Sequence, residues 1–163
     1  MHIKLISKKI KFGNYKIKCA IGKRGISSKK REGDNYTPRG TFKFKGLLYR
    51  KDRVLNIKTS LFKKSIKENM GWCDDTNSKH YNKLIKFPFR YSAEKLYRSD
   101  YIYDIILIMD YNQNPVIKGK GSAIFLHISK KNYSPTLGCI AIKKKHMRLL
   151  LRMIHKNSKI TIY

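Results

Sequence analysis

Two apolar runs joined by a short polar loop constrain this chain more than any other part of its sequence. Residues 123–128 are almost wholly apolar and contain His127 near their end. Residues 134–142 hold a proline, then Gly138 and Cys139, then a second apolar run. An uninterrupted apolar run of this length is typical of a buried strand. We therefore expect a strand that brings the imidazole of His127 to its edge, a loop, and a second strand that follows Cys139.

The spacing between His127 and Cys139 allows the two side chains to act as a pair. A loop of 12 residues can fold back and bring them together. A thiol is a good nucleophile only as the thiolate, which a neighbouring imidazole can generate. Gly138 would leave room for a carbonyl substrate beside the backbone N–H donors of an oxyanion hole. Taken alone, the spacing favours a simpler interpretation, a buried cysteine and a core histidine.

Further motifs occur in a fixed order along the chain, and together they resemble the YkuD-type L,D-transpeptidases. In that family a histidine is followed by a loop and then by Ser/Thr-His-Gly-Cys. The resemblance implies a single L,D-transpeptidase-like catalytic domain over residues 1–163. The matching segments are Lys30-Arg31-Glu32-Gly33-Asp34, Thr37 to Phe42, Gly71-Trp72-Cys73-Asp74-Asp75, Tyr81-Asn82, Asp110-Tyr111-Asn112 with Pro115, Gly121 to His127, and Thr136-Leu137-Gly138-Cys139-Ile140.

The resemblance implies an acyltransferase that acts on peptidoglycan stem peptides. Cys139 would attack a stem-tetrapeptide carbonyl, release D-alanine as a thioester forms, and pass the acyl group to an acceptor amine or to water. His127 would serve as the base. The backbone N–H groups of Gly138 and Cys139 would hold the oxyanion, and Thr136 would line the substrate site, although a turn role for Thr136 is equally open. No metal or organic cofactor is implied, and carbapenems are expected to acylate Cys139.

Two positions depart from the family pattern. Leu137 stands where a histidine is common, and Ala141 stands where an arginine is common. Both departures bear on substrate preference, and neither touches the Cys–His pair.

The formal net charge of +28 has three possible sources. Nucleic-acid binding rests on such charge, but the lysines are spread along the whole chain and no nucleic-acid motif accompanies them, so nucleic acid is not favoured. A cell-wall polymer is also an acidic partner. A solvated surface that reflects a compositional bias is the simplest explanation.

Two other functions fit the same sequence. A basic module without catalysis could bind wall polymer or nucleic acid, and its activity would survive the loss of Cys139. A cell-wall cysteine amidase or peptidase would cleave stems without transferring them.

The three cysteines suggest no metal site. Cys19, Cys73 and Cys139 form neither a CxxC pair nor a Cys/His cluster, and we expect Cys19 and Cys73 in the core.

No run of about 20 apolar residues predicts a membrane span, and no signal peptide is visible. The implied substrate lies in the cell envelope or periplasm, yet a cytoplasmic location stays open. We expect a monomer.

The remaining pattern predicts a mostly β, sandwich-like fold with one C-terminal amphipathic helix and short helical pieces. We expect the helix over residues 143–156, because Met147, Leu150, Leu151 and Ile154 share one face. The other expected elements are a hairpin over 2–21 around Gly13-Asn14, strands over 41–49, 101–109 and 160–163, a strand near Val54, an extended or helical piece over 62–70, a functional loop over 72–88 and a short helix over 94–98.

Overall fold

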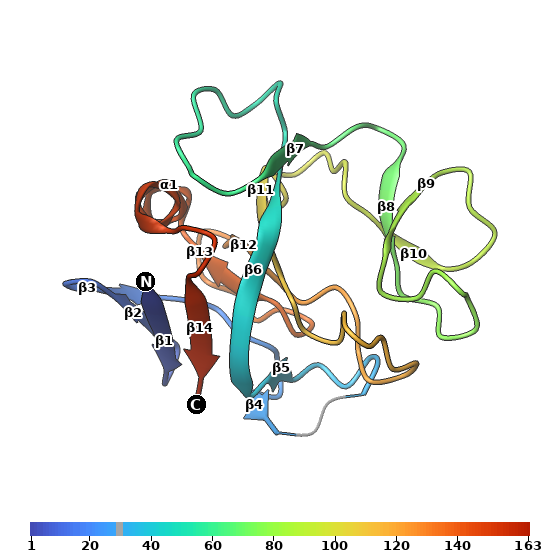
Figure 1. Cartoon of the computed structure of the whole chain (residues 1–163), viewed down its shortest axis with the longest axis horizontal. Coiled ribbons are helices and arrows are strands. Elements are labelled where there is room, and N and C mark those ends of the chain that lie inside the picture. The colour runs from blue at the N-terminus through green and yellow to red at the C-terminus, as the bar shows by residue number, and fades with distance from the viewer. Residues whose placement is uncertain (29–30) are drawn as a thin grey trace.

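A computed structural model describes residues 1–28 and 31–163; Lys30, from the first motif above, lies outside the described residues. Most strands form one large sheet in the order β13-β12-β11-β6-β14-β1-β2-β3, with β7 beside β6 (Figure 1). These strands are β1 (His2–Ile6), β2 (Lys9–Phe12), β3 (Tyr15–Lys18), β6 (Gly40–Tyr49), β7 (Lys63–Ser65), β11 (Ile105–Met109), β12 (Phe125–Ile128), β13 (Ile140–Ile142) and β14 (Lys159–Ile162).

The N-terminal strands follow directly from the alternation of lysine and apolar residues. Ile3, Leu5 and Ile10 are fully buried, while the lysines between them are exposed. The expected hairpin is in fact a three-stranded meander, because a second turn lies at Ser7-Lys8. Both residues adopt positive φ, 48° and 59°, and neither is a glycine or an asparagine, the residues that usually mark such a turn.

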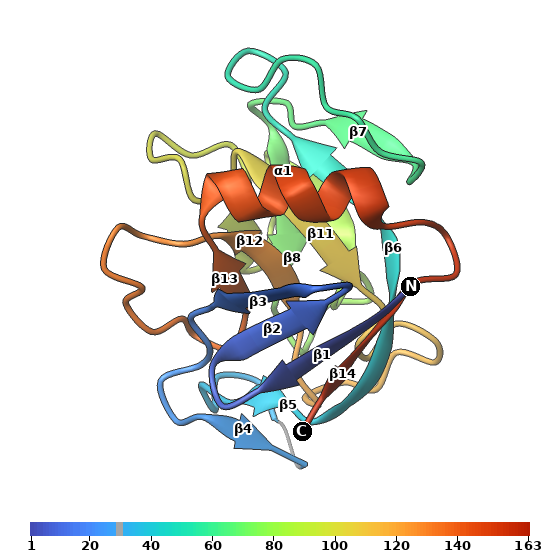
Figure 2. The same cartoon turned by 90° about the vertical axis from the view of Figure 1, so that its left-hand side faces the viewer.

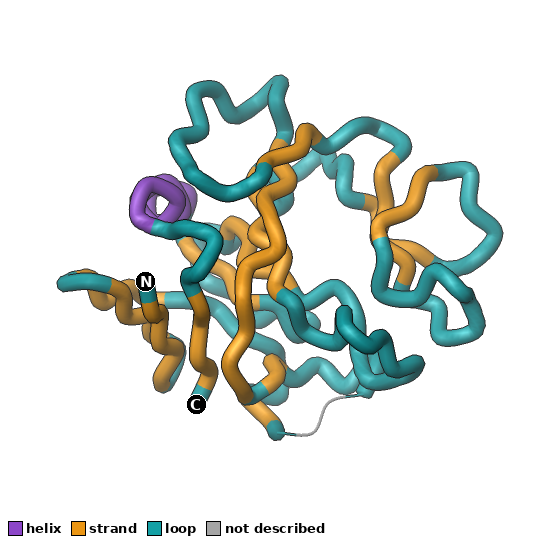
Figure 3. The backbone as a smooth tube through the Cα atoms, viewed as in Figure 1, coloured by secondary structure: helices purple, strands orange, loops and turns teal. Residues whose placement is uncertain are grey.

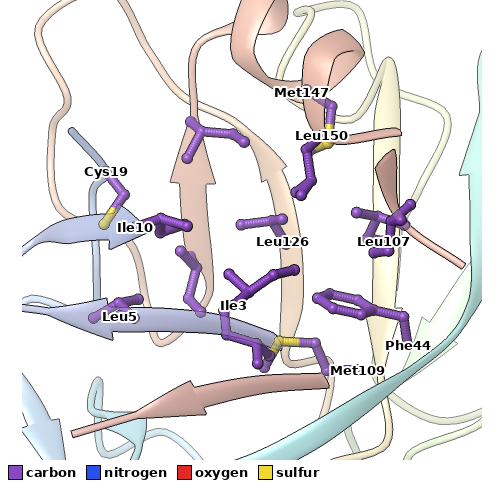
Figure 4. Close-up of a cluster of buried hydrophobic side chains, with 14 of the residues drawn as sticks. Ile3, Leu5, Ile10, Cys19, Phe44, Leu107, Met109, Leu126, Met147 and Leu150 are labelled. Carbon is purple, nitrogen blue, oxygen red and sulfur yellow. The ribbon is translucent and has the colours of Figure 1, made fainter. Parts of the chain in front are cut away.

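The single helix of the described residues, α1 (Lys144–Met153), crosses one face of the large sheet (Figure 2). Its residues Met147 and Leu150 pack into the main hydrophobic cluster with Leu126 and Ile3 (Figure 4). A second sheet, in the order β10-β8-β9, lies apart from the helix and is flanked by long loops (Figure 3). Its strands are β8 (Met70–Cys73), β9 (Leu84–Lys86) and β10 (Ala93–Lys95), and the short pair β4 (Ile26–Ser27) and β5 (Thr37–Pro38) completes the strands.

The mostly β architecture with one C-terminal helix is confirmed, and three local expectations are wrong. The predicted helix at 94–98 is replaced by β10, whose Glu94 pairs opposite Trp72. The strand expected over 101–109 begins only at Ile105, because residues 101–104 form turns, whereas residues 62–70, expected to be extended or helical, contain β7 and the start of β8 and are extended there. Val54 is buried but lies outside any strand.

The large sheet closes on itself beside the loop that precedes Cys139. Residues after β3 return to β13, where Ala20 and Ala141 exchange backbone hydrogen bonds of 2.8 and 3.0 Å. The Thr136 N–H also donates to the Ile21 carbonyl at 2.9 Å. This closure fixes the position of the loop.

In the described part of the chain, no helix is long and apolar enough to cross a membrane.

Candidate active site

His127 and Cys139 lie on neighbouring strands. His127 belongs to β12, which runs parallel to β13 with Leu126 opposite Ile140 and His127 opposite Ala141. Cys139 immediately precedes β13 and therefore lies level with Phe125, two residues before His127. Since residues two apart on a strand share a face, the thiol and the imidazole face the same side of the sheet.

Two backbone groups of one segment hold the sulfur of Cys139. The thiol donates to the Ala123 carbonyl at 3.1 Å, and the Phe125 N–H donates to Sγ at 3.4 Å. The expected strand over 123–128 begins only at Phe125, because Ala123 has the left-handed φ of 50°. This interruption is what turns the Ala123 carbonyl toward the thiol.

Burial keeps the imidazole of His127 neutral. The side chain is buried, and its Nδ1 lies 3.0 Å from the Ile128 carbonyl. A carbonyl oxygen can only accept, so Nδ1 carries the hydrogen and Nε2 is the basic nitrogen. Desolvation lowers the pKa of His127 to about 4, against the hydrogen bond to Ile128, which raises it, while the charge of Arg98 lowers it further. A neutral imidazole can accept a thiol proton.

Tyr103 is a buried residue that adjoins both members of the pair. Its ring meets the His127 ring edge-to-face at 5.2 Å, and its hydroxyl donates to Glu94 Oε1 at 2.6 Å. Burial, followed by the charges of Cys139 and Glu94, raises the pKa of Tyr103 well above its usual value. Sequence reasoning missed Tyr103 and Glu94, because nothing in the pattern distinguishes Tyr103 from any other core aromatic residue.

Two threonines hold the loop that leads to Cys139. The Thr136 hydroxyl donates to the Cys139 carbonyl at 2.6 Å and accepts from the Gly138 N–H at 3.2 Å. The fully buried Thr37 donates to the Gly138 carbonyl at 2.8 Å and accepts from the Gly22 N–H at 2.9 Å. Thr136 thus has a turn role. Its role in substrate binding, and those of Gly138 and Cys139 in the oxyanion hole, remain predictions.

Two residues of the other sequence motifs, Trp72 and Tyr81, contact the segment that precedes His127. Trp72 packs edge-to-face on Phe125 at 5.1 Å. Tyr81 donates to Glu32 at 2.6 Å and accepts from the Gly121 N–H at 2.9 Å. Leu137, at the position where the family commonly has histidine, is exposed.

Two surface hollows lie elsewhere on the molecule. One, of about 670 Å³, includes Arg39, Tyr111 and Lys120 in its lining, and another, of about 720 Å³, includes Lys67 and Tyr97. Neither hollow is lined by His127 or Cys139. The Cys–His pair and its backbone supports define the candidate site, because they bring together groups able to perform chemistry.

Comparison with known families points to the same chemistry. The family model of the L,D-transpeptidase catalytic domain, YkuD, matches residues 7–162. Comparison with curated proteins found no match. Within residues 1–28 and 31–163, no group of His, Cys, Asp or Glu side chains is arranged to hold a metal ion.

Proposed function

The chain belongs to the YkuD family of L,D-transpeptidase catalytic domains, and on this premise we propose that it is a cysteine acyltransferase of peptidoglycan. Its substrate would be a stem tetrapeptide, and residues 1–163 would act as one catalytic domain. The compartment of such a substrate is the cell envelope.

In the first half-reaction, His127 Nε2 takes the proton of the Cys139 thiol. The thiolate attacks the carbonyl of the L-centre residue at position three of the stem, and a C–S bond forms. The C–N bond to D-alanine breaks, and His127 returns the proton to the leaving amine. The backbone N–H of Cys139, with that of Gly138 after it leaves Thr136, would stabilise the oxyanion.

In the second half-reaction, an acceptor amine attacks the thioester. His127 takes a proton from the amine, a new amide bond forms, and the C–S bond breaks to regenerate the thiol. Water in place of the amine would release a tripeptide, so the same residues would then perform L,D-carboxypeptidase chemistry.

One observation carries the proposal: β12 and β13 place a neutral imidazole and a thiol on the same face of adjacent strands. Burial and the Ile128 carbonyl leave Nε2 as the basic nitrogen of His127. The thiol is held by backbone groups, and in the proposed reaction it would turn from the Ala123 carbonyl toward this base.

The test is incubation of the protein with disaccharide tetrapeptide, with products read by mass spectrometry. We expect loss of D-alanine together with cross-linked dimers, or tripeptide if water is the acceptor. Cys139→Ala should abolish both products, and His127→Ala should slow them by roughly 100-fold or more. Cys73→Ala, which removes another buried thiol, is the matched control and should keep turnover.

Two outcomes would replace the proposal. Absence of turnover, together with wall-polymer binding that Cys139→Ala retains, would indicate a binding module without catalysis, and turnover by Cys139→Ala would exclude Cys139 as the nucleophile. Release of the intact peptide from the sugar would indicate a cell-wall amidase.

A further inference from the structure

The peptide that holds the thiol is itself in an unfavourable conformation. Ala123 has φ of 50°, a left-handed geometry that costs a residue with a Cβ atom about 1–2 kcal/mol. It precedes the first residue of β12, so regular strand pairing does not hold it. A separate support must therefore hold the Ala123 carbonyl against the sulfur.

Asn82 provides this support. Its side chain is 3% exposed, and its carboxamide makes four hydrogen bonds. Oδ1 accepts from Trp72 Nε1 at 2.9 Å and from the Ala123 N–H at 3.1 Å. Nδ2 donates to the carbonyls of Tyr111 and Asn112 at 3.2 and 2.6 Å.

Asn82 is anchored in the small sheet rather than in the large one. Its backbone N–H donates to the carbonyl of Cys73, the last residue of β8, at 2.9 Å. Trp72, its neighbour in this network, packs on Phe125 of β12. Asn82 therefore links the small sheet to Ala123, whose carbonyl holds the sulfur of Cys139.

We propose that Asn82 is a positioning residue of the reaction, which acts through the Ala123 carbonyl to hold the Cys139 thiol in place and protonated until substrate arrives. A carbonyl oxygen stabilises a thiol and repels a thiolate, whereas the Phe125 N–H stabilises both. The role in turnover rests on the proposed function. The control of the thiol does not, because it can be measured without a stem peptide.

The test compares two asparagines that share one backbone conformation. Asn82 and Asn112 both have positive φ, 57° and 50°, so glycine fits either position without strain. Asn112 also braces its loop, with bonds to the Ile117 and Gly121 carbonyls at 2.9 Å. Asn82→Gly removes the support of Ala123, and Asn112→Gly is the matched control.

The readout is the rate of alkylation of Cys139 by iodoacetamide against pH, followed by intact-protein mass. A lost hydrogen bond worth about 1 kcal/mol corresponds to about 0.7 pH units. We expect the midpoint in Asn82→Gly to fall by at least about half that amount, and turnover on tetrapeptide to fall roughly 10-fold or more. The titratable groups beside the thiol, Tyr103 and His127, are the same in all variants, as are the charged groups that act on these two side chains, Glu94, Arg98 and Asp100.

An unchanged midpoint in folded Asn82→Gly, or an equal shift in Asn112→Gly, would overturn the proposal. If Asn82→Gly does not fold, Asn82→Ala removes the same carboxamide and its hydrogen bond to Ala123, and a midpoint there identical to wild type would also overturn the proposal. If the wild-type protein shows no turnover but the alkylation midpoint of Cys139 still falls in Asn82→Gly, the proposed function is rejected and the control of the thiol by Asn82 is retained.

Discussion

At the scale of single residues, the proposed chemistry depends on an imidazole that burial keeps uncharged. The pKa of His127 lies near 4 in the folded protein, against an ordinary value of 6.5. Between these values the unfolded chain binds more protons than the folded one, so folding stability falls as pH drops from 6.5 to 4. The whole loss amounts to about 3 kcal/mol.

The pH dependence of unfolding tests this prediction. His127→Asn can still donate to the Ile128 carbonyl but does not titrate, so its stability should decline less than that of wild type over this window. Glu94, whose pKa burial raises, works in the opposite direction and is common to both proteins. His80→Asn, at an exposed histidine, is the control. An equal reduction in the pH dependence of its folding stability would contradict the assignment to His127.

The three thiols should differ sharply in reactivity. Cys19 and Cys73 are 1% and 0% exposed, against 9% for Cys139, and burial raises the pKa of Cys19 to about 12 despite nearby Lys8. A carbapenem should therefore form one adduct, on Cys139, visible by intact-protein mass. The adduct should persist in Cys73→Ala, and its survival in Cys139→Ala would place the nucleophile elsewhere.

The candidate pair of His127 and Cys139 could be predicted from the sequence, but the residues that surround it could not. His127 and Cys139 stand in a recognisable motif, and apolar runs on both sides reveal their strands. Tyr103 and Asn82 act through contacts with residues distant in sequence, and no local pattern encodes such contacts. Thr136 shows the limit, since its position is compatible with both a turn and a substrate contact.

At the scale of secondary-structure elements, the local sequence pattern gave a wrong prediction where pairing with a neighbouring strand decides the conformation. Residues 94–98 suggested a helix, yet β8 draws Ala93 to Lys95 into a strand. Tertiary pairing often overrides a weak local preference of this kind. The long alternating or apolar segments, such as β6 and β11, were predictable because their burial pattern is strong.

The buried hydroxyl of Thr37 is one of the groups that hold the turn before Cys139. Thr37→Val keeps the shape but leaves the Gly138 carbonyl and the Gly22 N–H without their partner, at a cost of roughly 2–4 kcal/mol. Chemical denaturation should detect this loss. The exposed Thr41→Val, which also removes a threonine hydrogen bond, is the control. A similarly small change in the unfolding free energy of both variants would contradict this role of Thr37.

At the scale of the whole molecule, part of the positive charge lies in a row across three neighbouring strands. Lys16, Lys11 and Lys4 lie opposite one another on β3, β2 and β1, and all three are exposed. Neighbouring strands are about 4.8 Å apart, and like charges directly opposite are destabilising. None of these three strands contains an acidic residue.

Salt should therefore stabilise the fold. Lys11→Gln removes the middle charge of the row and should raise the unfolding free energy at about 0.01 M salt by a few tenths of a kcal/mol to about 1 kcal/mol. The gain should shrink at about 1 M salt, where the Debye length is about 3 Å. Lys67→Gln, an exposed lysine outside the row, should change little. If the gain in unfolding free energy of Lys11→Gln is the same at both salt concentrations, it has another cause than charge repulsion.

The position of β14 has a consequence for how the protein is made. Residues 159–162 pair with β1 on one side and with β6 on the other, so this sheet cannot be completed until the strands that precede β14 have been synthesised. Until then the nascent chain carries two incomplete half-sheets whose open edges can pair with other chains. Because these contacts span almost the entire sequence, closure is intrinsically slow. The growing chain must therefore avoid aggregation until β14 has been synthesised and has paired with both of its neighbours.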